Sequence, residues 1–282
     1  MTIKTILVAP IFEPQVEAVE PEHTIVAFAT QLACRHSAHL NICLGVGRLS
    51  LPSAVVVSEV QGLLNQTNED RGVAAKAFGS EALRRAQSEG VTASLELVCG
   101  DYSHTSRILT GFARASDISI LQSRDRLFGL SETVIEELMF SSGRPLILLP
   151  AKWNGNVAFP HIVVAWDGSA KAARAIGDAM PFIDAATNIE IVTIEGDSNR
   201  GKQIEGVDIA SRIARHSRNV HLTQLPCTSG DIAQTLRDHV AMTRADLLVM
   251  GAYGHARFRQ FIIGGVTRSV IADPPVPVLM SY

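Results

Sequence analysis

Segments typical of strands and segments typical of helices alternate along the whole chain, and their order is repeated once. Short apolar runs, such as residues 4–9 and 161–166, alternate with stretches whose apolar residues recur every three or four positions. The run at residues 144–150 holds the same place in the first half as residues 276–282 hold in the second, which indicates an internal duplication. The alternation predicts an α/β fold with two tandem, doubly wound, parallel five-stranded sheets of Rossmann-like type, covered by helices on both faces.

A segment with the composition of a linker separates the two halves. Residues 151–160 contain Gly155, two asparagines and Pro160, which together interrupt regular structure. A new strand-like run begins directly afterwards. We therefore expect two domains, at residues 1–153 and 154–282.

The composition fits a soluble globular protein and argues against several other classes. Of the 282 residues, 46% are hydrophobic and 19% are charged, which is enough apolar material for two domain cores. A net charge of −3 and the lack of any Lys and Arg run argue against nucleic acid as a partner. Pro10 and Pro14 break the apolar N-terminal run, so we expect no signal peptide or membrane span and a cytoplasmic location. The four cysteines form no C-x-x-C pair, and we expect buried core thiols that hold no metal.

The stretch at residues 247–270 carries the strongest indication of a binding site. A strand-like run ends in Gly251 and Gly254, and Gly264 and Gly265 precede a helix-like segment. Glycine lets the backbone approach an anion closely, and the N–H groups at the start of a helix attract negative charge. Taken singly, these glycines could merely form turns. Their joint position between a strand and a helix favours a phosphate site.

Polar residues near these glycines are further candidates for phosphate contacts. Thr267 lies in the first turn of the predicted helix, where its hydroxyl could bond a phosphate oxygen or simply cap the helix. His255, Arg257 and Arg259 on the connecting segment could add cationic contacts. A solvated loop is the commoner place for such residues.

Asp167 directly follows the first strand-like run of the second half. Its carboxylate could cap the helix that begins near Ser169, or recognise a polar group of a ligand, and both roles can hold together. Sheets of this kind bind ligands at the carboxyl ends of their strands, where the strand order reverses. Because Asp167 and Gly251 both follow strands, we expect them to share one edge of the sheet.

The sequence contains no familiar catalytic motif. We find no nucleophile elbow, no H-E-x-x-H zinc pair and no dinucleotide fingerprint. Residues 196–203 read GDSNRGKQ and are similar to a P-loop, but Gln203 stands where Ser or Thr holds Mg²⁺. A solvated loop is the better interpretation of that segment. The residues alone therefore name no catalytic group and no metal ligand.

The second half resembles a universal stress protein domain of the nucleotide-binding type. The family's signature is G-x-x-G, nine residues, then a glycine and a small residue, and this chain has GAYG at 251–254 and GG at 264–265 with nine residues between. The family's aspartate after the first strand corresponds to Asp167, and the ending PVPVL at 275–279 is also similar. The resemblance covers residues 158–282 through motifs, and the first half through the order of its elements alone.

The resemblance implies an adenine nucleotide, ATP, with or without Mg²⁺, as the ligand. In ATP-binding relatives the aspartate and a main-chain group of the second strand hold the adenosine, while the glycine loop and hydroxyl residues hold the phosphates. Carried over by position, the binding residues are Asp167, Ile194, Gly251, Gly254, Gly264, Gly265, Val266 and Thr267. Gly265 stands where serine is usual, so a lower affinity is expected.

The first half departs from the family pattern. No aspartate follows its first strand, and Gln122, Asp125 and Glu132 stand at the places of the first three signature glycines. A carboxylate near a phosphate repels it, so we do not expect this half to bind ATP in the same way. Because single-domain relatives pair through their last strands, we expect the first half to act as a built-in dimer partner. The two halves would then form an intramolecular pseudo-dimer, and a homodimer of whole chains is a further option.

Family analogy predicts an ATP-binding protein with a regulatory role in stress adaptation. Slow ATP hydrolysis is an alternative, although we can name no general base for it. A third possibility is an interaction module that binds no nucleotide. A flavin or nicotinamide oxidoreductase domain is disfavoured because the dinucleotide fingerprint is missing.

Overall fold

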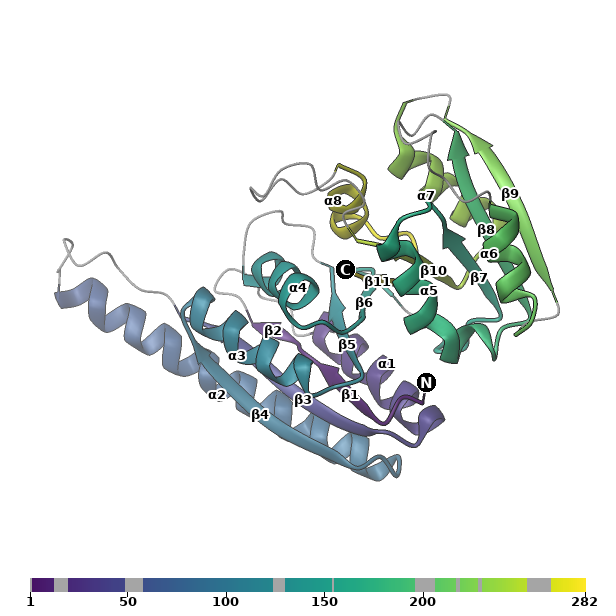
Figure 1. Ribbon diagram of the computed structural model, residues 1–282. Helices are drawn as coiled ribbons and strands as arrows, with labels where there is room; N and C mark the ends of the chain where they lie inside the picture. Colours follow the sequence, from purple (N-terminus) through teal and green to yellow (C-terminus); the bar gives the residue numbers. More distant parts are fainter. Residues whose placement is uncertain are drawn as a thin grey trace. The chain divides into compact units, whose positions relative to one another are not determined.

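The chain divides into two compact units, which are described separately. The computed structural model describes residues 2–12, 20–48, 58–123, 130–153, 155–195, 206–216, 219–227, 230–252 and 265–282 (Figure 1). The first unit comprises Ile3–Leu121 and Arg126–Arg144, and the second unit comprises Met1–Thr2, Gln122–Asp125 and Pro145–Tyr282.

The first unit is built on a parallel sheet. Its strands are β1 Thr5–Val8, β2 Ile11–Phe12, β3 His39–Gly47, β4 Ala93–Gly100 and β5 Ile118–Gln122, and its helices are α1 Glu20–His36, α2 Ser58–Ser88, α3 Tyr102–Arg114 and α4 Leu130–Ser141. The strands lie in the order β4-β3-β1-β5, and the short β2 pairs with the end of β3. The central strand β1 is apolar, and its Ile6, Leu7 and Val8 are completely buried.

Helices cover both faces of this first sheet. A β-carbon added at Gly79 of α2 would meet Leu44 of β3, whereas one added at Gly45 of β3 would meet Leu109 of α3. Successive strand residues point to opposite faces of a sheet. Since Leu44 and Gly45 are neighbours in β3, α2 and α3 lie on opposite faces.

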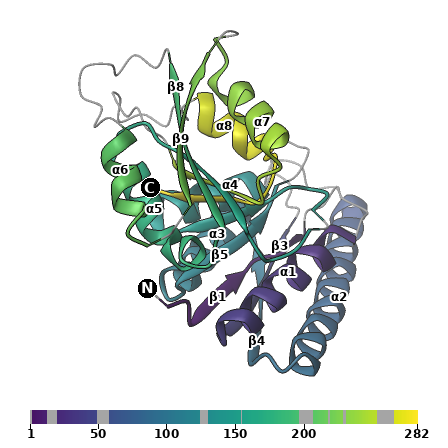
Figure 2. The same cartoon turned by 90° about the vertical axis from the view of Figure 1, so that its right-hand side faces the viewer.

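The second unit has the same architecture with one additional strand. Its strands are β6 Leu146–Leu149, β7 His161–Ala165, β8 Asn188–Glu195, β9 Val220–Pro226, β10 Leu247–Gly251 and β11 Val278–Ser281, and its helices are α5 Ala170–Ile183, α6 Gly206–Ile213, α7 Ile232–Thr243 and α8 Gly265–Ala272. The strand order is β6-β11-β10-β7-β8-β9. Figure 2 shows α6 and α7 on opposite sides of β8 and β9.

The two units share one strand order. When β2 and β6 are set aside, the third, second, first and fourth strands of each unit lie side by side, as β4-β3-β1-β5 in the first unit and β9-β8-β7-β10 in the second. The connections between these parallel strands run through helices. The α/β fold class with tandem Rossmann-like halves, expected from the sequence, is thus confirmed.

The strand β6 differs from the place assigned to it by the sequence pattern. We expected the run at 144–150 to close the first half, but β6 groups with the second unit and pairs antiparallel with β11. Leu148 stands opposite Val278, and Leu146 opposite Met280. All four β6 residues are at most 1% exposed. Within the second unit, β6 therefore covers the edge of β11 that would otherwise be open.

Among the described residues, no helix is both long enough and apolar enough to cross a bilayer.

Candidate functional site

The strand order of the second unit reverses between β7 and β10. From β7 the chain continues to β8 and β9 on one side, whereas β10 and β11 lie on the other. The two central strands are parallel, and Ala165 of β7 stands opposite Met250 of β10. Gly251 follows Met250 directly and Asp167 lies two residues after Ala165, so both lie at the carboxyl edge where sheets of this type bind ligands.

Asp167 and Ser169 both accept main-chain hydrogen bonds at the start of α5. Ser169 is the helix N-cap, and its Oγ accepts a hydrogen bond from the N–H of Ala172 at 3.1 Å. Asp167 instead accepts from the N–H of Ser169, with its Oδ1 at 2.9 Å. Between them, Gly168 has a φ of 74°, in the left-handed region that glycine tolerates. The N-cap of α5 is therefore Ser169 rather than Asp167. Asp167 instead stabilises the turn that precedes the helix.

Gly251 lies against the first turn of α5. A β-carbon built on it would stand 2.5 Å from the backbone nitrogen of Ala172 and 2.8 Å from the carbonyl carbon of Lys171. Both distances are far shorter than any normal contact. Glycine at this position is therefore required by helix packing, whatever ligand the edge binds.

The end of β11 completes the edge next to β10. The N–H of Ala252 donates to the carbonyl of Ser281 at 2.8 Å. Ser281 is 2% exposed, and its hydroxyl donates to Oδ2 of Asp178 on α5 at 2.9 Å. These bonds fix α5, β10 and β11 to one another just below the candidate site.

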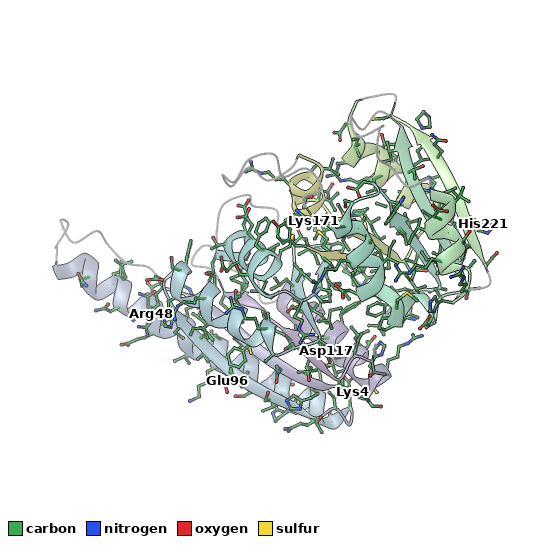
Figure 3. The ribbon with its side chains drawn as sticks, viewed as in Figure 1. Lys4, Arg48, Glu96, Asp117, Lys171 and His221 are labelled. Atoms are coloured by element: carbon green, nitrogen blue, oxygen red, sulfur yellow. The ribbon has the colours of Figure 1, made fainter. Side chains whose placement is uncertain are left out.

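Lys171, which the sequence patterns did not single out, brings a positive charge to this edge (Figure 3). Its Nζ lies 3.8 Å from the ring centroid of Tyr282, in a cation–π contact. Partial burial lowers the pKa of Lys171 from its ordinary value, while the nearby negative charge of Asp167 acts in the opposite direction. A single lysine early in a helix carries no distinctive spacing, so only the fold could reveal it.

The residues in the first turn of α8 differ in solvent exposure. Gly265 is exposed, and a β-carbon there would meet no atom of the described residues within 4 Å. Val266 is half-buried, and Thr267 is 3% exposed. Arg237 of α7 ties the middle of this helix down, because its Nη2 donates to Oγ of Ser269 at 2.7 Å.

Of the remaining predicted residues, the structure describes Ile194 but not the rest of the glycine loop. Ile194 is half-buried in β8, where it pairs with Leu225 of β9 in parallel register. Gly254, Gly264, His255, Arg257, Arg259 and residues 196–203 lie outside the described residues.

The residue that matches Gly251 in the first half is used structurally. The Nε2 of Gln122 donates to the carbonyls of Pro150 and Ala151, at 3.2 and 3.1 Å. Glu132, another counterpart, lies half-buried in the first turn of α4. The third counterpart, Asp125, lies outside the described residues.

Comparisons with known proteins agree with this architecture. Residues 158–281 match the family model described as "Universal stress protein family". A universal stress protein of Synechocystis is 25% identical over 147 residues, which cover 51% of this chain and 49% of the relative. The alignment thus spans about half the length of that curated relative.

Solved structures show the likeness in fold over the whole chain. A universal stress protein from Archaeoglobus fulgidus has a TM-score of 0.71 at 17% identity, covering 98% of this chain and 97% of that one. A putative universal stress protein from Pseudomonas aeruginosa has a TM-score of 0.60 at 13% identity, covering 99% and 93%. Residues 158–281 are therefore similar to the universal stress protein family, and the whole chain shares the α/β fold of these solved structures.

Proposed function

We propose that the second unit binds an adenine nucleotide, ATP, and that the protein acts as a nucleotide-dependent regulator in stress adaptation. The observation that carries this proposal is the pairing of Ala165 with Met250, which brings Asp167 and Gly251 to one sheet edge. The G-x-x-G, nine residues, G-G spacing of the family's nucleotide-binding type starts at that same edge. A regulatory role is proposed by analogy with the family.

In this proposal different residues would contact the adenosine and the phosphates of the nucleotide. Asp167, whose Oδ1 already accepts from Ser169, and the main chain of Ile194 would hold the adenosine. The main chain at Gly251 and the first N–H groups of α8 would hold the phosphates, because helix starts attract anions. Thr267 is 3% exposed, so we assign phosphate contacts to main-chain N–H groups before its hydroxyl. Magnesium, when bound with ATP, would neutralise part of the phosphate charge.

We propose no ATP site of this kind in the first half. At the position that matches Gly251, the side chain of Gln122 is already bonded to two main-chain carbonyls. Its proposed contribution is structural, through the β6 strand that pairs with β11.

Thermal unfolding of the whole protein with and without Mg-ATP tests the proposal. At an ATP concentration of about a hundred times Kd, binding to the folded state alone adds about 2.7 kcal/mol of stability. Gly265→Glu should abolish this gain, because it places a negative charge at the start of α8 where a β-carbon has open space. If ATP at concentrations up to about millimolar does not stabilise the wild type, the proposal is contradicted.

The matched control is Gly111→Glu on α3, another exposed glycine with nothing within 4 Å of an added β-carbon. It should retain the full stabilisation by ATP. Gly251 is unsuitable for this purpose, because any side chain there collides with α5. Release of phosphate, measured on the same samples, separates binding from hydrolysis.

A further inference from the structure

The helix α8 is short, and contacts with the rest of the second unit must hold it in place. It comprises eight residues, Gly265–Ala272, whereas isolated helices shorter than about 12–15 residues are marginal in water. Its buried residues are Thr267, Val270 and Ile271. In the function proposed above, the first N–H groups of this helix hold the phosphates. The direction of the helix axis therefore decides where those N–H groups point.

Arg237 of α7 binds the opposite end of α8 with two sides of its guanidinium. Its Nε donates to the carbonyl of Asp273 at 3.0 Å, and its Nη2 donates to the carbonyl of Ser269 and, at 2.7 Å, to the Ser269 hydroxyl. A cation is favoured at this end of a helix, where the carbonyls point outward. Because Ser269 and Asp273 are four residues apart, the planar guanidinium spans about one helical turn. Attachment at two successive turns resists both sliding and tilting of the axis.

Arg237 is itself held firmly by its own helix. The neighbouring Leu236 and the nearby Val240 are 2% and 1% exposed, so α7 is well packed at this point. The side chain of Arg237 is 14% exposed, and its Nη1 donates to Oε1 of Gln234 at 3.4 Å. The guanidinium therefore offers α8 a fixed point of attachment.

We propose that Arg237 is a positioning residue of the phosphate site, which acts through α8 and sets the direction of its first N–H groups. The inference rests on the function proposed above and deepens it, because it assigns part of the affinity for phosphates to a residue at the far end of the helix. Ser269 and Asp273 lie about 6 and 12 Å along the axis from Gly265, at a rise of about 1.5 Å per residue. Preorganised donors strengthen binding because the ligand need not order them.

Two other roles for Arg237 make different predictions. If its positive charge only attracts the phosphates over a distance, a lysine at the same position should serve equally well. If it only stabilises the fold, its removal should lower stability and leave the affinity of the folded protein for phosphorylated and unphosphorylated ligands in the same proportion. Comparison of ATP with adenosine, in two variants, separates these roles from positioning.

The experiment is isothermal titration of the whole protein with ATP and with adenosine, at a temperature where circular dichroism shows each variant to be folded. For Arg237→Met we expect ATP to bind about ten- to a hundredfold more weakly, which equals the loss of one hydrogen bond to a charged group. Adenosine should bind as it does to the wild type. Arg237→Lys should lose at least about tenfold for ATP, because one ammonium is a point donor that cannot span the two carbonyls. If Arg237→Met does not fold, Arg237→Lys carries the test.

The matched control is Arg114→Met in the first unit. The Nε of Arg114 on α3 donates to the carbonyl of Ser141, the last residue of α4, at 2.9 Å. This variant removes the same kind of bond from the half for which we propose no nucleotide site, and it should leave both affinities unchanged.

Three results would overturn the inference and leave the nucleotide site in place. They are an unchanged affinity for ATP in Arg237→Met, an equal loss of ATP and adenosine in that variant, and wild-type affinity for ATP in Arg237→Lys. Failure of the wild type to bind either ligand would instead remove the proposed function itself, and the inference with it.

Discussion

Gly251 and Ala172 approach each other so closely that a β-carbon on Gly251 would stand 2.5 Å from the Ala172 nitrogen. The contact joins the end of β10 to the first turn of α5, which begins just after Asp167. The first glycine of the binding motif is therefore also a packing residue. In the proposed nucleotide site Gly251 would have a second role, because its main chain would lie beside the phosphates held by the start of α8.

The first prediction concerns this contact. Gly251→Ala should lower the free energy of unfolding by about 1–3 kcal/mol, because backbone atoms of α5 must shift to admit the methyl group. Gly265→Ala, where a β-carbon meets none of the residues that the structure describes within 4 Å, should leave stability unchanged or raise it by up to about 1 kcal/mol. Urea unfolding followed by circular dichroism measures both. Equal effects of the two substitutions would show that the close approach is not maintained in solution.

The second prediction concerns the pairing of β6 with β11. Ile147 stands opposite Leu279 and is completely buried. Ile147→Ala should cost about 2–5 kcal/mol, the range for truncating a large apolar side chain in a core. The comparison is Met242→Ala on α7, which is 74% exposed and should change stability by no more than about 0.5 kcal/mol. A similar small change for Ile147→Ala would mean that β6 detaches from β11 readily.

Most elements of the fold could be predicted because their patterns are local. The sequence pattern predicts helices over residues 102–116 and 169–182, and the structure has them as Tyr102–Arg114 and Ala170–Ile183. The sequence pattern predicts a helix over residues 71–89, but the helix begins at Ser58. The pattern missed the first turns because they are polar and glycine-bearing and show no apolar stripe. The partner of β6 could not be read from periodicity, since a buried apolar run looks the same in parallel and antiparallel pairing.

The candidate site was predictable where a motif marks it. The edge shared by Asp167 and Gly251 follows from two strand ends and the strand order. Lys171 and the bonds of Gln122 could not be predicted, because each depends on chain segments that only the tertiary fold brings together. The same holds for the cap of α5, where Asp167 and Ser169 are equally good capping residues by type.

The third prediction concerns pH. Burial, together with the charges of Arg35 and Lys4, lowers the pKa of His36 at the end of α1 below its ordinary value of 6.5. As pH falls through 6.5, the unfolded chain takes up the proton first, so the stability contributed by neutral His36 is lost between 6.5 and the lowered folded pKa. His36→Gln should therefore lose less stability than the wild type between about pH 7.5 and about pH 5.5. Urea unfolding at the two pH values measures the difference.

A nuclear magnetic resonance titration of the folded protein checks the cause. The His36 ring should titrate below 6.5, and Arg35→Gln should raise its pKa by removing the larger of the two repelling charges. A folded-state pKa above 6.5 would reverse the expected pH dependence.

The fourth prediction concerns thiol reactivity, where the sequence expectation was partly wrong. We expected buried thiols, but Cys34 on α1 is exposed, while Cys43 on β3 is completely buried. Burial, and secondarily the charge of Glu96, raises the pKa of Cys43 to about 12. An aromatic disulfide reagent should therefore label Cys34 in the native protein and Cys43 only after unfolding, because the thiolate is the reactive form. Native labelling that persists at position 43 in Cys34→Ser would contradict this assignment.

The last prediction concerns Gly265, where relatives of the nucleotide-binding type carry serine. The side chain of a serine would fit, because a β-carbon at Gly265 has open space and the residue is exposed at the start of α8. If ATP binds as proposed, Gly265→Ser should tighten it about ten- to a hundredfold, the gain from one hydrogen bond to a charged group. Gly265→Ala, which adds the carbon without the hydroxyl, should leave the affinity unchanged in the same titration. Equal tightening by serine and alanine would assign the gain to a stiffer helix start rather than to a phosphate contact.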